Sequence, residues 1–159
     1  MDLANDEFIN FLTCASMHKL SYLCIGGQAV NYYGYHRSTN DLDVWIAPNN
    51  HNKVAFIKTL HCMGYSESET SDIEKEDFSS YFMCSLGHPP STIDVLTIVH
   101  KEISFEDAEK NMEVMKINDT VEMRFIPYHG LLDIKTRSSR FKDWDDVAKL
   151  KELNKDKNL

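Results

Sequence analysis

Two aspartates separated by one residue, Asp41 and Asp43, stand at the start of an apolar segment that runs to Ala47. We predict a strand over this segment, ended by Pro48. Because side chains at positions i and i+2 of a strand point to the same face, the two carboxylates would stand side by side. Such carboxylates repel each other, and a hard divalent cation such as Mg²⁺ would relieve the repulsion. The alternative interpretation is a turn or capping pair at the strand edge.

The same spacing recurs in Asp143-Trp144-Asp145, but in a segment with helical periodicity. Positions i and i+2 of a helix diverge by about 200°, so those two carboxylates cannot converge. We interpret this second pair as solvated surface or as the first turn of a helix. The comparison favours a functional interpretation for the pair in the strand.

A third carboxylate, Asp94, interrupts the β-rich apolar segment from Thr92 to Val99. A carboxylate in such a segment is costly unless it is paired or bound to metal. If this strand adjoins the 41–47 strand, three carboxylates converge and could hold metal for phosphoryl or nucleotidyl transfer. Asp94 could also act as a general base on an acceptor hydroxyl. The alternative is an edge-strand aspartate that is bonded to the backbone.

The pair Gly26-Gly27 ends a predicted strand over 21–25 and precedes a predicted helix over 28–35. Glycine lets the backbone approach a phosphate closely, and a helix N-terminus offers free N–H groups. The pair is not a P-loop, because no Gly-Lys-Ser/Thr follows it. A plain turn is the alternative.

The remaining elements, expected from periodicity and turn residues, alternate between helix and strand. Their mixture predicts an α/β or α+β fold with a mixed sheet. We expect helices over 3–18, 51–63, 104–115, from Pro127 onward and over 142–153, strands over 78–86, 92–99 and 121–126, a turn over 87–90, and a polar loop or solvated hairpin over 66–77.

The bulk composition sets limits on the function. The 159 residues fit one domain, and 42% hydrophobic with 26% charged residues is a globular balance. The net charge of −8 argues against broad nucleic-acid binding, which needs clustered basic residues. The four cysteines form no CxxC or metal-ligand spacing, so we expect reduced thiols. The chain shows neither a signal peptide nor a membrane span, so a cytoplasmic protein is expected.

Together these residues resemble the DNA polymerase β-like nucleotidyltransferase superfamily. Its signature is a hydrophobic residue followed by Gly and Gly or Ser, then an Asp-hydrophobic-Asp/Glu strand, then a third Asp on a later strand. The corresponding segments here are Ile25-Gly26-Gly27, Asp41-Leu42-Asp43 after thirteen intervening residues, and Asp94.

A wider match resembles the small bacterial nucleotidyltransferases of abortive-infection and toxin–antitoxin systems. It covers about residues 22 to 150, nearly the whole chain. The residues that carry it are Gly26 to Val30, Gly34, Arg37 to Asp43, Leu131 to Lys135, and the segment from Arg140 through Asp146 to Leu150.

The resemblance implies a nucleotidyltransferase fold within a single domain, 1–159. A central mixed β-sheet would be flanked by helices, with C-terminal helices at about 127–154 packed on it. It implies Mg²⁺ or Mn²⁺ and a nucleoside triphosphate donor, from which a nucleoside monophosphate is moved to a hydroxyl acceptor. The roles it implies are metal ligation by Asp41, Asp43 and Asp94, and nucleotide binding by Gly26, Gly27, Lys135 and, in assistance, Arg37.

Two departures from the family pattern concern the substrates. Many relatives have Ser at the position of Gly27, so donor binding here would depend more on backbone N–H groups and Lys135. Little chain remains for a separate acceptor domain, so the 66–90 region, a homodimer or a partner protein would supply acceptor recognition. The acidic charge favours a small molecule or a protein hydroxyl over RNA.

Three alternatives stay open at this stage. An antitoxin-like or nucleotide-binding partner module would keep the fold with little catalysis. A phosphohydrolase or nuclease could use the same acidic cluster, although it would have no need for the Gly26-Gly27 turn. Finally, Arg37 and Lys135 could be ordinary surface charges, since helix lysines are usually solvated.

Overall fold

A six-stranded mixed sheet lies between two layers of helices in the computed structural model, which describes residues 5–156. The strand order is β3-β4-β2-β1-β6-β5. The β2–β4 and β1–β6 pairs are parallel and the other pairs are antiparallel. The strands are β1 (Tyr22–Cys24), β2 (Leu42–Ile46), β3 (Met83–His88), β4 (Ser91–Leu96), β5 (Glu113–Lys116) and β6 (Glu122–Phe125).

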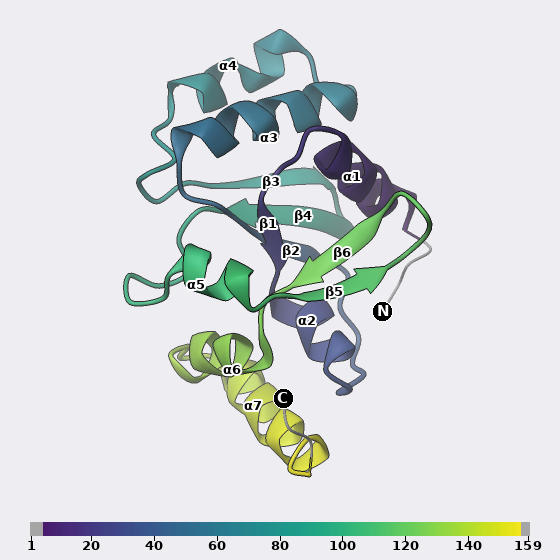
Figure 1. The fold of residues 1–159 in the computed structure, drawn as a ribbon, viewed down its shortest axis with the longest axis vertical. Coiled ribbons are helices and arrows are strands. Elements are labelled where there is room, and N and C mark those ends of the chain that lie inside the picture. The colour runs from purple at the N-terminus through teal and green to yellow at the C-terminus, as the bar shows by residue number, and fades with distance from the viewer. Residues whose placement is uncertain (1–4, 157–159) are drawn as a thin grey trace.

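The helices divide between the two faces of this sheet. In Figure 1, α3 and α4 lie above the strands with α1 beside them at the upper right, and α2, α6 and α7 lie below the strands with α5 at the left. The mixed sheet flanked by helices is the predicted fold class. The helices are α1 (Asp6–Met17), α2 (Gly26–Tyr32), α3 (Asn50–Cys62), α4 (Glu67–Lys75), α5 (Phe105–Lys110), α6 (Tyr128–Thr136) and α7 (Phe141–Leu153).

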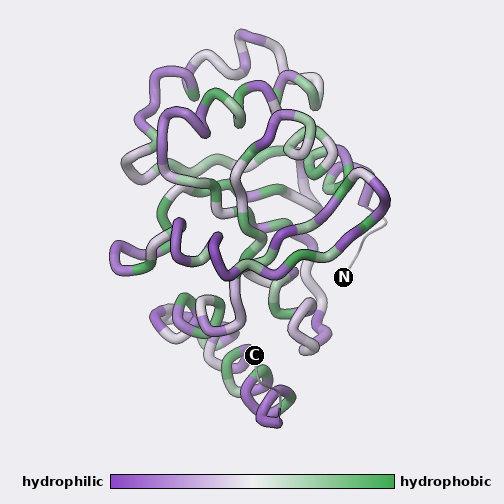
Figure 2. Tube along the Cα trace, in the orientation of Figure 1, coloured by the Kyte–Doolittle hydropathy of each residue, from purple (hydrophilic) through white to green (hydrophobic). Residues whose placement is uncertain are grey.

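Strand β2 is central to both the core and the site. Leu42, Val44 and Ile46 are fully buried on one face. Trp45 points to the other face and packs edge-on against Phe105 of α5, with ring centroids 5.0 Å apart. Figure 2 shows hydrophobic residues concentrated along the central strands, whereas hydrophilic residues dominate α4. The buried alternate positions therefore fix which face of β2 carries its polar residue, Asp43.

Helix α4 replaces the polar loop or hairpin that we expected over 66–77. The Ser66 side chain bonds the backbone at Glu69, and the Glu69 carboxylate accepts a hydrogen bond from the Ser66 N–H at 2.8 Å. This reciprocal capping box satisfies two free N–H groups of the first turn. The prediction was wrong because the segment lacks apolar periodicity, while its helix signal lies in the capping residues.

The segment from 104 to 115 is also not one helix. Helix α5 ends at Lys110, and β5 follows as an edge strand paired antiparallel with β6. Most of β5 is exposed, so its sequence carries no clear alternation of buried and exposed positions. Its strand conformation follows from pairing with β6, which is a tertiary contact.

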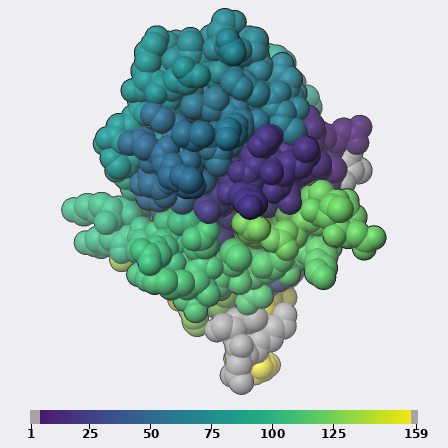
Figure 3. All heavy atoms as spheres, turned by 45° about the horizontal axis from the view of Figure 1, so that its top comes forward, coloured from purple at the N-terminus to yellow at the C-terminus, as the bar shows by residue number. Residues whose placement is uncertain are grey.

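A disulfide joins Cys14 of α1 to Cys62 of α3, whereas we expected all four cysteines to be reduced. Cys24 and Cys84 are free thiols. The two bridged helices pack side by side on one face of the sheet, and Figure 3 shows them in contact at the surface. Within residues 5–156, the helices are all too short or too polar to cross a membrane.

Candidate active site

Asp43 and Asp94 are neighbours on adjacent parallel strands. The register pairs Asp43 of β2 with Asp94 of β4, and the flanking partners Val44 and Val95 are fully buried. Because side chains alternate along a strand, both aspartates leave the sheet on the face opposite those valines. That face is the one on which α2 and α6 lie (Figure 1).

Asp41 lies one residue before β2 rather than inside the predicted strand. Its Oδ1 atom accepts hydrogen bonds from the Thr92 backbone N–H at 3.2 Å and from the Thr92 hydroxyl at 3.0 Å. The same hydroxyl oxygen lies 3.4 Å from Oδ1 of Asp94. Thr92 therefore links the first and third carboxylates, a role that the sequence did not suggest.

The Gly26-Gly27 turn packs directly on Asp43. Gly26 has φ +60°, and a β-carbon at this position would overlap the Asp43 carboxylate. The backbone N–H of Gly27 lies 3.4 Å from Asp43 Oδ2, and a β-carbon on Gly27 would overlap Thr39. Both positions therefore require glycine for close approach, one of them also for its positive φ.

The environment of Asp43 disfavours its charge. Burial raises the pKa of this carboxyl above its ordinary value of 3.8. The Gly27 N–H acts in the opposite direction, and the neighbouring carboxylates of Asp94 and Asp41 raise the pKa further. A cation beside Asp43 would offset both the burial and the repulsion.

The described residues hold no ready-made cluster of three or more His, Cys, Asp or Glu ligands. The carboxylate of Asp94 accepts a hydrogen bond from the Ser85 hydroxyl at 2.6 Å, and that of Asp41 is held by Thr92. Mg²⁺ is usually bound through one or two carboxylates together with water and substrate phosphates. The adjacent carboxylates thus fit an ion that binds together with a phosphate-bearing substrate.

Lys135 is almost fully buried, with 4% exposure, and faces helix α7. Its Nζ atom lies 2.7 Å from both Asp143 Oδ1 and Asp146 Oδ2. Arg37 forms a two-pronged pair with Asp146, with Nε–Oδ1 at 2.7 Å and Nη2–Oδ2 at 2.9 Å. Both predicted phosphate-binding cations are therefore engaged by carboxylates of α7.

Asp143 and Asp146 are the charged residues whose part in this network sequence reasoning missed. Asp143 does lie in the first turn of α7, but it is buried and not solvated. Burial alone would raise its pKa, but hydrogen bonds from Lys135, Ser138 and Arg140 outweigh this and lower the pKa to about 2. The signal was available, since Asp143, Asp146 and the buried Leu150 share one helix face.

A cavity of about 270 Å³ joins these two groups of residues. One wall carries the glycine turn and the three aspartates, and the other carries the N-terminal part of α7 and the C-terminal part of α6. The basic groups on the helical wall are Arg37, Lys135, Arg140 and Lys142. The cavity thus has an acidic side and a basic side.

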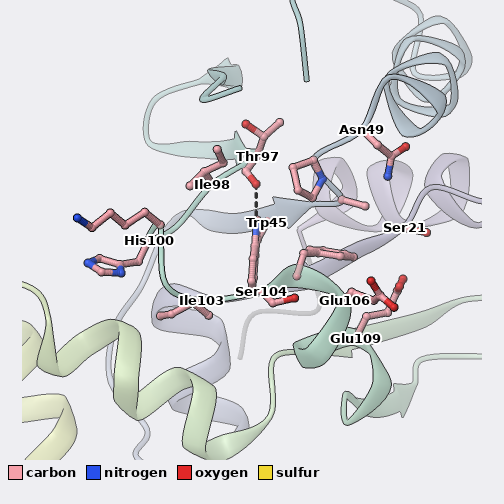
Figure 4. A pocket seen from close by; sticks show the side chains of 14 residues that line it. Ser21, Trp45, Asn49, Thr97, Ile98, His100, Ile103, Ser104, Glu106 and Glu109 are labelled. Atoms are coloured by element: carbon pink, nitrogen blue, oxygen red, sulfur yellow. Dashed lines mark hydrogen bonds between the residues drawn. The ribbon is translucent and has the colours of Figure 1, made fainter. Parts of the chain in front are cut away.

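A larger cavity of about 630 Å³ lies at the other end of β2 and contains none of the predicted site residues. Figure 4 shows Trp45 at its base, where the indole N–H donates to the Thr97 carbonyl at 2.8 Å. Trp45 is only 1% exposed, so its ring is packed rather than available for stacking. The chemistry-bearing residues therefore belong to the smaller cavity.

No family model matches the chain, and no curated protein matches it in sequence. A solved structure is similar: the crystal structure of the lincosamide antibiotic adenylyltransferase LnuA with lincomycin bound. The TM-score is 0.52 with 16% sequence identity, and the match covers 94% of this chain and 97% of that chain. The likeness establishes a shared fold, that of a nucleotidyltransferase.

Proposed function

We propose that the protein is a metal-dependent nucleotidyltransferase that moves a nucleoside monophosphate from a nucleoside triphosphate to a hydroxyl acceptor. The observation that carries this proposal is the cross-strand pair Asp43–Asp94, which packs against the Gly26-Gly27 turn. Across the cavity from this pair lies the basic wall, by which we mean the helical wall with its four basic groups. The shared fold supports it, because the similar structure is an adenylyltransferase.

The acidic side would carry the reacting groups. Asp43, with Asp41 and Asp94, would hold Mg²⁺ or Mn²⁺, which neutralises charge on the phosphates when it is bound. Asp94 would take the proton from the acceptor hydroxyl as that oxygen bonds to the α-phosphorus. The bond from the α-phosphorus to the bridging oxygen then breaks, and pyrophosphate leaves.

The basic side would hold the triphosphate. Arg140 and Lys142 line the cavity, and the backbone of Gly26 and Gly27 forms the opposite wall. Arg37, Lys135 and Arg140 are already paired with Asp143 or Asp146, but the four basic groups outnumber these two carboxylates. The wall therefore keeps a net positive charge that suits a polyanionic donor.

A small hydroxylated molecule is the acceptor class that we favour. The net charge of −8 disfavours RNA, and the structurally similar protein is named for acting on lincosamide antibiotics. A protein hydroxyl is the second acceptor class.

The test is transfer of label from each α-³²P nucleoside triphosphate to a panel of small hydroxylated molecules, proteins and RNA, with Mg²⁺ or Mn²⁺. We expect metal-dependent release of pyrophosphate and loss of transfer in Asp43→Ala and Asp94→Ala. Transfer that survives both substitutions would falsify the proposal. Release of inorganic phosphate without transfer would instead indicate a phosphohydrolase.

A partner-binding module of the antitoxin type is the second candidate, and one observation favours it. Both cations predicted to contact phosphate, Arg37 and Lys135, are engaged by buried carboxylates. Calorimetry with nucleoside triphosphate and Mg²⁺ discriminates the two functions. Absence of nucleotide binding together with tight retention of a partner protein would favour this module.

A further inference from the structure

On the face of the sheet that holds the aspartates, side chains of β3 lie beside side chains of β4. The β3–β4 register places Ser85 beside Asp94 and Met83 beside Leu96. The hydrogen bond from Ser85 Oγ to Asp94 Oδ1, at 2.6 Å, shows that these two side chains share a face. Because Met83 precedes Ser85 by two residues, it lies on that face as well.

The helices leave the β3 side of this face open. Met83 is 52% exposed and Tyr81 is 64% exposed. Phe82 and Leu86, which alternate with them, are buried in the core on the other face. We call the surface formed by Tyr81, Met83, Ser85 and Leu96 the β3 shelf.

The β3 shelf is continuous with the candidate active site. Its polar member, Ser85, is hydrogen-bonded to Asp94, and Met83 and Leu96 follow in the next row of side chains. Positions i and i+2 of a strand lie about 7 Å apart. A molecule with a hydroxyl at Asp94 can therefore rest an apolar part on Met83 without crossing to the basic wall.

We propose that the β3 shelf binds the acceptor, and that this acceptor is a small molecule with its reactive hydroxyl on a largely apolar frame, neutral or cationic. This inference rests on the proposed nucleotidyltransferase function. Ser85 would orient the Asp94 carboxylate beside the hydroxyl, and Met83, Tyr81 and Leu96 would contact the frame. Thioether and aromatic side chains adapt to irregular apolar surfaces of this kind.

Charge supports this choice of acceptor over a nucleic acid. Within the site, Asp94 is hydrogen-bonded to Ser85 of the β3 shelf, and Thr92 links Asp94 to Asp41, whereas Arg140 and Lys142 belong to the helical wall of the cavity. An RNA acceptor would set its phosphates against Asp94. A neutral or cationic molecule meets no such repulsion.

The experiment follows the Met83 methyl group by NMR in protein labelled with ¹³C-methyl methionine, assigned with Met83→Leu. Saturating α,β-methylene ATP with Mg²⁺ is added first, and then separately lincomycin, kanamycin, a serine-containing peptide and an RNA oligonucleotide. We expect lincomycin to shift the Met83 signal, whereas kanamycin, whose polyhydroxylated, polycationic frame is not apolar, should leave it unmoved. Met83→Glu should alter the affinity for lincomycin by about tenfold or more, weakening it for a neutral frame. Met17→Glu, at a methionine 68% exposed at the end of α1, should leave it unchanged.

The outcomes separate the two proposals. If the ATP analogue binds and lincomycin does not move the Met83 signal, the shelf proposal is overturned while the proposed function stands. The shelf proposal is likewise overturned if only the peptide or the RNA moves the signal, or if the signal shifts with protein concentration alone, which would indicate contact with a second copy of the chain. If the ATP analogue does not bind, the proposed function fails, and the shelf proposal with it.

Discussion

Gly26 lies against Asp43 so closely that a β-carbon on residue 26 would overlap the Asp43 carboxylate. This contact explains why a glycine is needed at the start of α2. The backbone at Gly26 has a positive φ and lies directly against the Asp43 side chain. Any side chain at position 26 would therefore displace the carboxylate that we assign to the metal.

Gly26→Ala should therefore impair the site more than it impairs the fold. Gly34→Ala is the matched control, because Gly34 also has a positive φ of +101° but has open space around it. The positive φ alone costs about 1–2 kcal/mol of stability in each variant. We expect only Gly26→Ala to lose Mg²⁺-dependent nucleotide binding, measured by calorimetry. Equal nucleotide affinity in the two variants would contradict the assigned contact.

Substitutions of Asp43 and of Asp94 should impair nucleotidyl transfer in different ways, although the two residues are cross-strand partners. Asp43→Asn is expected to reduce transfer by about a hundredfold or more, with weaker donor binding in Mg²⁺, because a metal ligand is lost. Asp94→Asn should lower kcat by roughly 10²–10⁴ with a smaller loss of donor affinity than in Asp43→Asn, because the general base is lost while Asp41 and Asp43 still hold the metal. Asp119→Asn, in an exposed turn, is the control. Steady-state kinetics and donor titration measure both effects.

The raised pKa of Asp43 predicts a pH-dependent stability. The pKa of Asp43 in the folded protein lies above the ordinary 3.8. The stabilisation that the folded state gains from protonating Asp43 is therefore complete below pH 3.8, and it is lost as the pH rises through the folded-state pKa. In EDTA, Asp43→Asn should gain stability relative to wild type as the pH rises above 3.8. Mg²⁺ at neutral pH should reduce this difference. The measurement is the thermal unfolding midpoint of each protein as a function of pH. A constant difference between the midpoints of wild type and Asp43→Asn across the pH series would rule out the raised pKa.

Sequence patterns predicted the strand faces of the candidate aspartates better than the contacts around them. The alternation of buried residues around Asp43 and Asp94 assigned each to one face of its own strand. Their pairing in register is a tertiary contact that no local pattern contains. Helix α4 was missed because its signal, Ser66 followed by Glu69, lies in capping rather than in apolar periodicity.

The charged residues of the helical wall show a second feature that sequence patterns do not predict, namely whether a charged side chain is buried. Lys135 was expected to face phosphate or solvent, and the structure buries it between Asp143 and Asp146. Whether a charged side chain is buried depends on which helix packs against it, and spacing within one helix does not reveal that. The sequence thus indicated a basic group on α6 but not its carboxylate partners.

The Cys14–Cys62 disulfide should contribute measurably to stability. It closes a loop across 48 residues, so its reduction is expected to lower the free energy of unfolding by about 2–4 kcal/mol. Denatured protein without reductant should expose only the thiols of Cys24 and Cys84 to a thiol reagent. The Cys14→Ser variant should be insensitive to reductant. Four reactive thiols in the unreduced protein would show that the bond does not form.

Asp146 should be more important to stability than any surface aspartate, because it is fully buried and holds both Lys135 and Arg37. Removing one member of a buried ion-pair network leaves the others without compensation, at a cost of about 3 kcal/mol. Asp146→Asn should therefore lower the unfolding midpoint in urea substantially. Asp133→Asn is the matched control, because its partner Arg137 is exposed and such pairs contribute little. Equal midpoints for the two variants would mean that α7 does not hold the basic wall through Asp146.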